Sequence, residues 1–310
     1  MSRAGGWLAL GLSASGCLPK DTRPEPGRAL VSVHPSDSLL TGIAAEATED
    51  GWAIEYQRLL IGLGRVDLEG DRCTVYSDAD YTRLFDLLLP GAQKVSEQYA
   101  LGSCDFGFGV VPPSASSLLG QGVSEADAIF MRTPPTDPAV SRRGISLYVE
   151  GQATRGSARE RFAWAFRWRV SYQDCATTRN GELAVGLELA SGQEQEVEIQ
   201  ISGDALFRDD PDPELAKLRF AAFAAADAQS GNADGEVSLD ELRQVKLADL
   251  SPGGGYQRLV SAASSDVPPF VGAEPTLEDY LLVSAFPGMA RFRDDGSCVA
   301  RVRARSDDFD

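Results

Sequence analysis

Oxygen-bearing side chains gather at close spacing between residues 223 and 242, and their types and spacing suggest a specific chemistry. Asn232, Asp234 and Glu241 offer amide or carboxylate oxygens, and Gly235 between them permits a sharp turn. Calcium is a hard cation that takes roughly six to eight oxygen ligands from such groups. The spacing therefore predicts a loop that wraps around one calcium ion.

This spacing resembles that of an EF-hand calcium loop. If Gly235 is the turn glycine at the sixth position, Asn232 and Asp234 fall at the third and fifth positions. Val237 then stands where such a loop has its core-facing aliphatic residue, and Glu241 stands where it has its bidentate carboxylate. From Asn232 onward the resemblance is nearly complete.

The loop departs from the EF-hand pattern at its start, because Ser230 occupies the first position, where an aspartate is expected. Asp227 instead follows Phe223 by four residues at the end of an alanine-rich helical run, as the first ligand of an EF-hand usually does. We therefore assign Asp227 as the first ligand. Inserted residues, drawn from Gln229, Ser230 and Gly231, are then expected to bulge out of the loop.

The resemblance implies one calcium held weakly, because no second EF-hand is visible to pair with this one. A plain acidic helix-turn-helix is the alternative, with Asp234 and Gly235 as a turn and Ser238 as the next N-cap. The expected ligands are the side chains of Asp227, Asn232 and Asp234, the carbonyl of Glu236, Ser238 directly or through water, and both carboxylate oxygens of Glu241.

The N-terminal residues resemble a bacterial lipoprotein signal. Arg3 is followed by an apolar run too short to span a bilayer, and small residues then precede Cys17. The resemblance implies that residues 1–16 are removed, that Cys17 receives lipid, and that residues 17–28 form a tether. Because no aspartate follows Cys17, it also implies sorting to the outer membrane of the cell envelope. A soluble N-terminal helix with an incidental cysteine is the alternative.

Removing Cys17 from the cysteine count leaves four, enough for two disulfide bridges in an oxidising compartment. No close spacing among Cys73, Cys104, Cys175 and Cys298 suggests a zinc or redox motif. Of the three connectivities we favour Cys73 with Cys104 and Cys175 with Cys298, because each pair then joins segments predicted to be strands. Four buried free thiols are the alternative.

The composition restricts the function classes. A net charge of −17 over 310 residues argues against nucleic acid or anionic lipid as a partner, and 43% hydrophobic residues suffice for a sizeable core. His34 is the single histidine, and no nucleophile motif accompanies it. A serine or cysteine triad and a histidine-rich metal site are therefore disfavoured.

Most of the chain reads as short strands. Residues 161–172 alternate strictly, with aromatic or branched side chains on one face and small or basic side chains on the other. The aromatic face is interpreted as core, with a sugar-binding platform as the alternative. Residues 183–189 and 197–201 continue the pattern as an antiparallel meander. Residues 52–68 alternate with a change of phase, which indicates either a bulge or bend near Gly62 and Gly64 or a break between strands.

These patterns predict a mainly β fold, an antiparallel β-sandwich with a helical EF-hand-like insertion or lobe. The expected parts are residues 29–205 for the sandwich, 206–250 for the helical segment and 251–310 for a return to the sandwich. Further strands are expected at 29–33, 85–89, 103–111, 145–151 and 299–304, and short helices after Ser124 and at 276–283.

Glycine and aliphatic patterns within residues 51–175 are similar to those of periplasmic β-sandwich proteins associated with methanobactin uptake. They include residues 60–68, 99–102, 106–110 and 147–151. The resemblance implies a fold only, since one histidine and three methionines make a soft-ligand copper site hard to build. Three function classes follow: a lipid-anchored calcium-binding protein with a structural or binding role and an unidentified partner, a metal-handling or ligand-binding accessory of the methanobactin-associated type, and a carboxylate-based enzyme.

Overall fold

The computed structural model describes residues 24–77, 81–134, 144–179, 182–230, 232–250, 255–256, 274–293 and 296–303. Within these ranges the chain is mainly β, as the alternating apolar positions predicted. The strands are β1 (Gly27–Pro35), β2 (Ala53–Glu69), β3 (Cys73–Val75), β4 (Thr82–Asp86), β5 (Gln93–Val110), β6 (Leu118–Leu119), β7 (Leu147–Arg155), β8 (Ala158–Phe166), β9 (Arg169–Arg179), β10 (Glu182–Val185), β11 (Leu187–Leu189), β12 (Glu194–Ile201), β13 (Glu236–Val237), β14 (Ala290–Phe292) and β15 (Ser297–Arg303).

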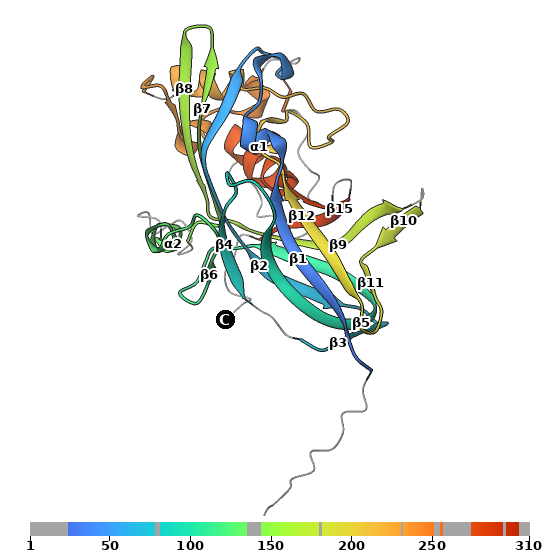
Figure 1. The fold of residues 1–310 in the computed structure, drawn as a ribbon. Helices are drawn as coiled ribbons and strands as arrows, with labels where there is room; N and C mark the ends of the chain where they lie inside the picture. The colour runs from blue at the N-terminus through green and yellow to red at the C-terminus, as the bar shows by residue number, and fades with distance from the viewer. Residues whose placement is uncertain are drawn as a thin grey trace, which may run out of the picture.

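All these strands belong to one curled sheet (Figure 1). Its main path runs β13–β8–β7–β2–β5–β1–β12–β14. The two longest strands hold it together, because β2 pairs with β7, β4 and β5 along its length and β5 pairs with β1, β2, β9 and β11. Strands this long twist and bend, which lets one sheet enclose a core.

The sheet is mixed rather than purely antiparallel. β1 pairs with β12 in parallel, as do β4 with β6 and β8 with β13. The expected meander is therefore wrong after β10: β9 and β10 form an antiparallel hairpin, but β11 pairs with β5 and β12 with β1. Gly186 separates β10 from β11 with φ +67°, a conformation that favours glycine, and a Cβ there would lie 2.0 Å from the Cys104 carbonyl oxygen.

The phase change in residues 52–68 is a pair of register shifts within one strand, not a break. β2 shifts register between Tyr56 and Arg58 and again between Gly64 and Asp67. Gly64 lies so close to β4 that a Cβ there would be 2.3 Å from the Tyr81 carbonyl oxygen. A bulged strand with glycine at the close approach therefore accounts for the pattern.

The alternating segment 161–172 is divided between two strands, which corrects the single strand that was expected. β8 ends at Phe166 and β9 begins at Arg169. The aromatic face is buried as expected: Phe162, Trp164 and Phe166 are 0% exposed. These side chains belong to the core, and a sugar platform on this face is excluded.

Short helices cover part of the sheet (Figure 1). The segment 206–250 was expected to be a helical lobe, but its helices are short and pack into the same core as the sheet, so that Phe223 contacts Trp164 with ring centroids 5.4 Å apart. The helical elements are α1 (Asp37–Thr41), η1 (Ala45–Ala47), α2 (Glu125–Arg132), η2 (Asp204–Phe207), α3 (Ala221–Ser230), α4 (Leu239–Leu242), η3 (Leu247–Asp249), α5 (Leu277–Tyr280), the π-helical turn Leu281–Ala285 and η5 (Pro287–Met289).

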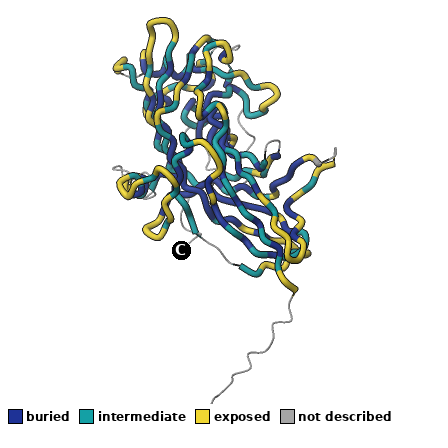
Figure 2. The backbone as a smooth tube through the Cα atoms, in the orientation of Figure 1, coloured by how far each residue is buried: buried dark blue, intermediate teal, exposed yellow. Residues whose placement is uncertain are grey.

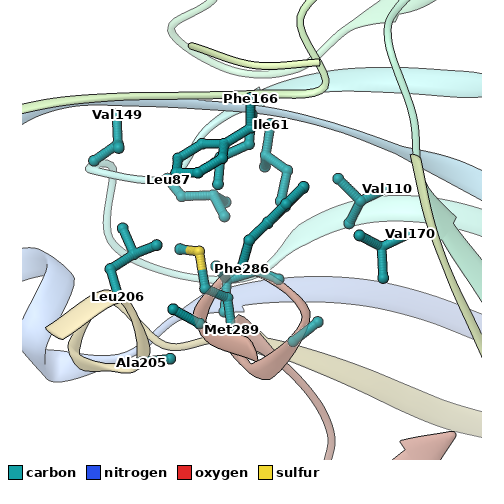
Figure 3. Packing of buried hydrophobic residues seen from close by; sticks show 14 of the residues in the cluster. Ile61, Leu87, Val110, Val149, Phe166, Val170, Ala205, Leu206, Phe286 and Met289 are labelled. Carbon is teal, nitrogen blue, oxygen red and sulfur yellow. The ribbon is translucent and has the colours of Figure 1, made fainter. Parts of the chain in front are cut away.

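The core lies inside the curl of the sheet, where buried residues follow one another along the strands (Figure 2). Figure 3 shows Phe166 and Ile61 from the sheet facing Phe286 and Met289 from the helical turns near the C-terminus. Phe166 and Phe286 have ring centroids 5.1 Å apart. The C-terminal segment thus returns to the sheet, through β14 on β12 and β15 on β9.

Two disulfide bridges are present, Cys73–Cys104 and Cys175–Cys298. This is the connectivity that the sequence favoured. The first joins β3 to β5, and the second joins β9 to β15, so each bridge fastens a peripheral strand to a longer one.

Candidate calcium site

Helix α3 presents Asp227 to the predicted loop. Its alanine-rich sequence favours a helix. Asp50, from a distant part of the chain, caps its first turn: Asp50 Oδ2 accepts hydrogen bonds from the backbone N–H groups of Phe220 and Ala221 at 2.8 and 2.7 Å. Asp227 lies in the last turn of this helix and is only 3% exposed. A carboxylate is rarely buried this far unless it is paired, so the partners of Asp227 define the site.

The loop returns to Asp227 after the helix ends. Asp227 Oδ1 accepts a hydrogen bond from the backbone N–H of Asp234 at 3.2 Å, and its Oδ2 accepts one from Gly235 at 3.1 Å. The Asp227 carbonyl also accepts from Ala233 N–H at 3.3 Å. Gly235 makes the turn with φ +78°, a conformation that favours glycine. These hydrogen bonds join the carboxylate of Asp227 to the turn of the returning chain.

The inserted residues do not bulge out of the loop as expected. Gln229 and Ser230 continue helix α3 by one more turn, and Gly231 lies outside the described residues. The extra residues are accommodated in the helix, because α3 continues past Asp227 to Ser230 before the chain reverses direction. Asp227 therefore meets the loop from the start of the last turn of α3, three residues before the helix ends.

Asn232 and Asp234 are brought together on the returning chain. Asn232 Oδ1 accepts from the N–H of Asp234 at 3.1 Å, and Asn232 Nδ2 donates to Asp234 Oδ2 at 2.9 Å. Asp234 Oδ1 accepts from the N–H of Glu236 at 2.9 Å. Each of these oxygens keeps a further lone pair for another donor or for a cation.

Ser238 and Glu241 form a capping box at the start of α4. Ser238 Oγ accepts from the N–H of Glu241 at 3.3 Å, and Glu241 Oε2 accepts from the N–H of Ser238 at 2.8 Å. Ser238 is thus the N-cap that the helix-turn-helix alternative also requires. Bidentate binding of a cation by Glu241 requires its carboxylate to turn away from the Ser238 N–H.

The loop is fixed to the sheet through β13. Glu236 and Val237 pair in parallel with Arg161 and Phe162 of β8, and Arg161 N–H donates to the Gly235 carbonyl at 2.9 Å. Trp164 Nε1 donates to the Val237 carbonyl at 2.9 Å, and Val237 is fully buried. β8 therefore supplies the pairing partner for this loop.

Glu160 on β8 faces the same loop and was missed in the sequence analysis. Burial and the negative charges of Asp227, Asp234 and Glu241 raise the pKa of its carboxyl group above the usual value. Its Oε2 atom is buried and accepts no hydrogen bond from the described residues. No local signal identifies Glu160, because it precedes the loop by more than sixty residues and arrives there by strand pairing.

The donor set suits calcium in kind, since it consists of carboxylate, amide and carbonyl oxygens without nitrogen or sulfur ligands. The ligand side chains do not converge on one point in this structure. Among the described residues no three His, Cys, Asp or Glu side chains lie close enough to hold a metal ion. The carboxylates instead accept hydrogen bonds from the backbone of the loop. Binding therefore requires side-chain rotation on a preformed backbone.

The other candidate residues are not brought together. His34 lies on β1 with its Nε2 3.2 Å from Ser32 Oγ and 3.7 Å from Glu198 Oε1. Met131 and Met289 are buried in two separate clusters. The described residues thus assemble no soft-ligand copper site.

Cys17 and the segment 1–23 lie outside the described residues. Within the part of the chain that the structure describes, no helix has the length and apolar character needed to cross a membrane.

Comparison of this chain with protein-family models, with curated proteins and with solved structures finds no match.

Proposed function

We propose that the loop from Asp227 to Glu241 binds one calcium ion, and that the ion acts as a structural clip in a lipid-anchored binding or structural protein. One observation carries this proposal: the buried carboxylate of Asp227 is met by the backbone N–H groups of Asp234 and Gly235. Those hydrogen bonds close the chain into a ring that holds the backbone of Asp234 and Gly235 against Asp227. On the same returning segment the side chains of Asn232 and Asp234 are hydrogen-bonded to each other.

The ligands that we expect lie on this loop. They are Asp227, Asn232, Asp234, the Glu236 carbonyl, Ser238 directly or through water, and Glu241. Glu241 must exchange its hydrogen bond with Ser238 N–H for the ion, and this exchange lowers the net gain on binding. We therefore expect a dissociation constant on the order of 10⁻⁴ to 10⁻³ M, as in extracellular modules. Such a site suits a protein exposed to external calcium.

The proposed location is the bacterial cell envelope, with Cys17 carrying lipid, residues 1–16 removed and the outer membrane as the destination. The two disulfides support an oxidising compartment. The net charge of −17 supports a partner other than nucleic acid. We also propose that the facing parts of the curled sheet act as the two layers of a β-sandwich.

Calorimetric titration of ligand variants tests the proposal. Glu241→Gln is expected to abolish measurable binding, because it removes a charged bidentate ligand, and Asp227→Asn is expected to weaken binding strongly. Ser230→Ala is the matched control, because the expected ligand set does not use this residue. Loss of binding in Ser230→Ala with retention in Asp227→Asn would place the start of the loop at Ser230 instead.

A further inference from the structure

Arg291 lies on the outer face of the sheet without a partner for its guanidinium. It stands on β14 between Ala290 and Phe292, which belong to the core, and successive residues of a strand point to opposite faces. Arg291 is half-buried, and its side chain makes no hydrogen bond or ion pair with the described residues. A guanidinium carries five N–H donors, and withdrawing them from water without an acceptor costs free energy.

Gln200 lies directly beside Arg291 on the same face. The two are register partners on β12 and β14, and the residues before and after Gln200 in the chain are buried. Gln200 is half-buried as well, and its amide group has no hydrogen-bond partner in the described part of the chain. His34 of β1 is the other register partner of Gln200, but its ring already lies against Ser32 and Glu198. Arg291 and Gln200 therefore offer adjacent N–H donors that these parts of the protein do not use.

A second guanidinium lies near this pair, at the end of η2. Arg208 Nη2 donates to Asp204 Oδ2 at 2.6 Å, and Asp204 Oδ1 accepts from the hydroxyl groups of Ser38, at 3.3 Å, and of Ser202. The carboxylate of Asp204 is thus already occupied by three donors. Burial, and after it the positive charge of Arg208, lowers the pKa of Arg291, although Asp204 acts in the opposite direction. The two guanidinium groups therefore repel each other, and the single carboxylate does not form an ion pair with Arg291.

This group of side chains carries two positive charges and one negative charge, whereas the whole chain has a net charge of −17. A positively charged corner of this kind attracts anions. Guanidinium groups bind carboxylate and phosphate oxygens with two parallel hydrogen bonds. One guanidinium can engage both oxygens of a carboxylate, whereas a phosphate group has further oxygens for a second guanidinium and for an amide.

We propose that Arg291, Arg208 and Gln200 bind a phosphate group on the outer face of β12 and β14, either as the free anion or as a phosphate monoester. Arg291 is the principal ligand, because its donors have no competing acceptor among the described residues. Gln200 contributes its amide N–H group, and Arg208 contributes charge and the donors that Asp204 leaves open. The site shares no residue with the proposed calcium loop and does not depend on it.

Calorimetric titration at constant ionic strength tests the site with inorganic phosphate, with glycerol phosphate and with acetate. Wild type is expected to bind phosphate at least about tenfold more tightly than acetate. Arg291→Gln is expected to weaken phosphate binding at least about tenfold, and Arg291→Lys at least about threefold, because lysine keeps the charge but loses the planar fork. Arg72→Gln is the matched control: Arg72 is an exposed arginine outside the site, and its loss is expected to change the affinity by less than about twofold.

Thermal melting without phosphate separates a binding defect from a folding defect. Arg291→Gln is expected to melt as wild type does, because its side chain has no hydrogen bond to lose among the described residues. If it melts lower, Arg291→Lys at wild-type melting temperature replaces it in the comparison. Tighter binding of glycerol phosphate than of inorganic phosphate would assign the site to a monoester, and the reverse order to the free anion. No binding of either phosphate by wild type, equal binding of acetate, or an equal loss in Arg72→Gln would overturn the proposal.

Discussion

Asp50 shows how a single distant residue positions the candidate site. It precedes Phe220 by 170 residues, yet its carboxylate accepts hydrogen bonds from the N–H groups of Phe220 and Ala221 at the start of α3. Helix α3 has no capping side chain of its own at this end, because Phe220 stands where an N-cap residue would be. Asp50 therefore takes the role of the N-cap from another part of the chain.

Asp50→Ala is expected to lower the free energy of unfolding by about 1 kcal/mol, because it leaves the N–H groups of Phe220 and Ala221 without their acceptor. Urea denaturation measures the change. Asp240→Ala is the control, since the Asp240 side chain is 84% exposed and its loss is expected to change stability by less than about 0.5 kcal/mol. Equal stability of the two variants would show that Asp50 does not cap α3.

The raised pKa of Glu160 makes a pH-dependent prediction. A carboxyl group whose pKa is higher in the folded state than in the unfolded state destabilises the fold when ionised, and this penalty disappears as pH falls through the folded pKa. The charged groups around it are Asp227 on α3, Asp234 in the loop and Glu241 on α4, with the Arg161 and Glu236 pair beside them. Without calcium, Glu160→Gln is therefore expected to be more stable than wild type at neutral pH.

Denaturant melts at several pH values measure that difference. It is expected to shrink as the pH is lowered and the wild-type carboxyl becomes protonated. A difference that stays constant with pH would show that Glu160 does not titrate with a raised pKa.

The sequence shows the loop residues of the candidate site but not the residues that reach it from elsewhere in the chain. Asn232, Asp234, Gly235 and Glu241 lie within one short stretch, where spacing alone limits their geometry. Glu160 and Asp50 reach the site through strand pairing and helix docking, and neither leaves a local pattern in the sequence.

At the scale of elements, the two disulfides fasten strands over loops of very different length. Cys73–Cys104 has a sequence separation of 31 residues and Cys175–Cys298 one of 123. Closing the longer loop removes more conformational entropy from the unfolded chain. The bridge between β9 and β15 is therefore expected to contribute more to stability.

Replacing each cysteine pair by serine tests this order. Loss of either bridge is expected to cost roughly 2 to 4 kcal/mol, with the larger loss for Cys175 and Cys298. Denaturation of the two double variants, measured alongside each other, gives the comparison. A larger loss for Cys73 and Cys104 would show that native contacts, rather than loop length, dominate the contribution of each bridge.

Elements were predicted better than their pairing. The sequence predicted β1, β7 and β15 within a few residues of their observed bounds, but only the second half of β5, which begins at Gln93 rather than near Ser103. The division between β8 and β9 was missed because the apolar alternation continues through the break at Trp168. The parallel pairing of β1 with β12 was missed as well, since register between distant strands is decided by the core that they share.

At the scale of the whole molecule, the chain enters the sheet at the end remote from the helices of the candidate site. β1 begins near the lower end in Figure 1, and β8 with the neighbouring helical segment lies near the upper end. The described chain therefore begins at the end of the molecule remote from the candidate calcium loop.

Cys17→Ser tests the anchor. The wild-type protein from a bacterial host is expected to begin at Cys17, to carry lipid by mass spectrometry and to partition into detergent, whereas the variant remains uncleaved or soluble. If the wild-type protein carries no lipid and partitions into the aqueous phase, the lipid anchor is wrong. The proposed calcium site does not depend on this result.

Thermal or chemical denaturation with and without calcium tests most directly whether calcium stabilises this fold through the loop from Asp227 to Glu241. With the expected affinity, about 10 mM calcium should raise the free energy of unfolding by about 1.4 to 2.7 kcal/mol in wild type. Glu241→Gln should show no such gain, and magnesium at the same concentration should give a smaller one. No stabilisation of the wild type by calcium, or an equal gain in Glu241→Gln, would contradict the account.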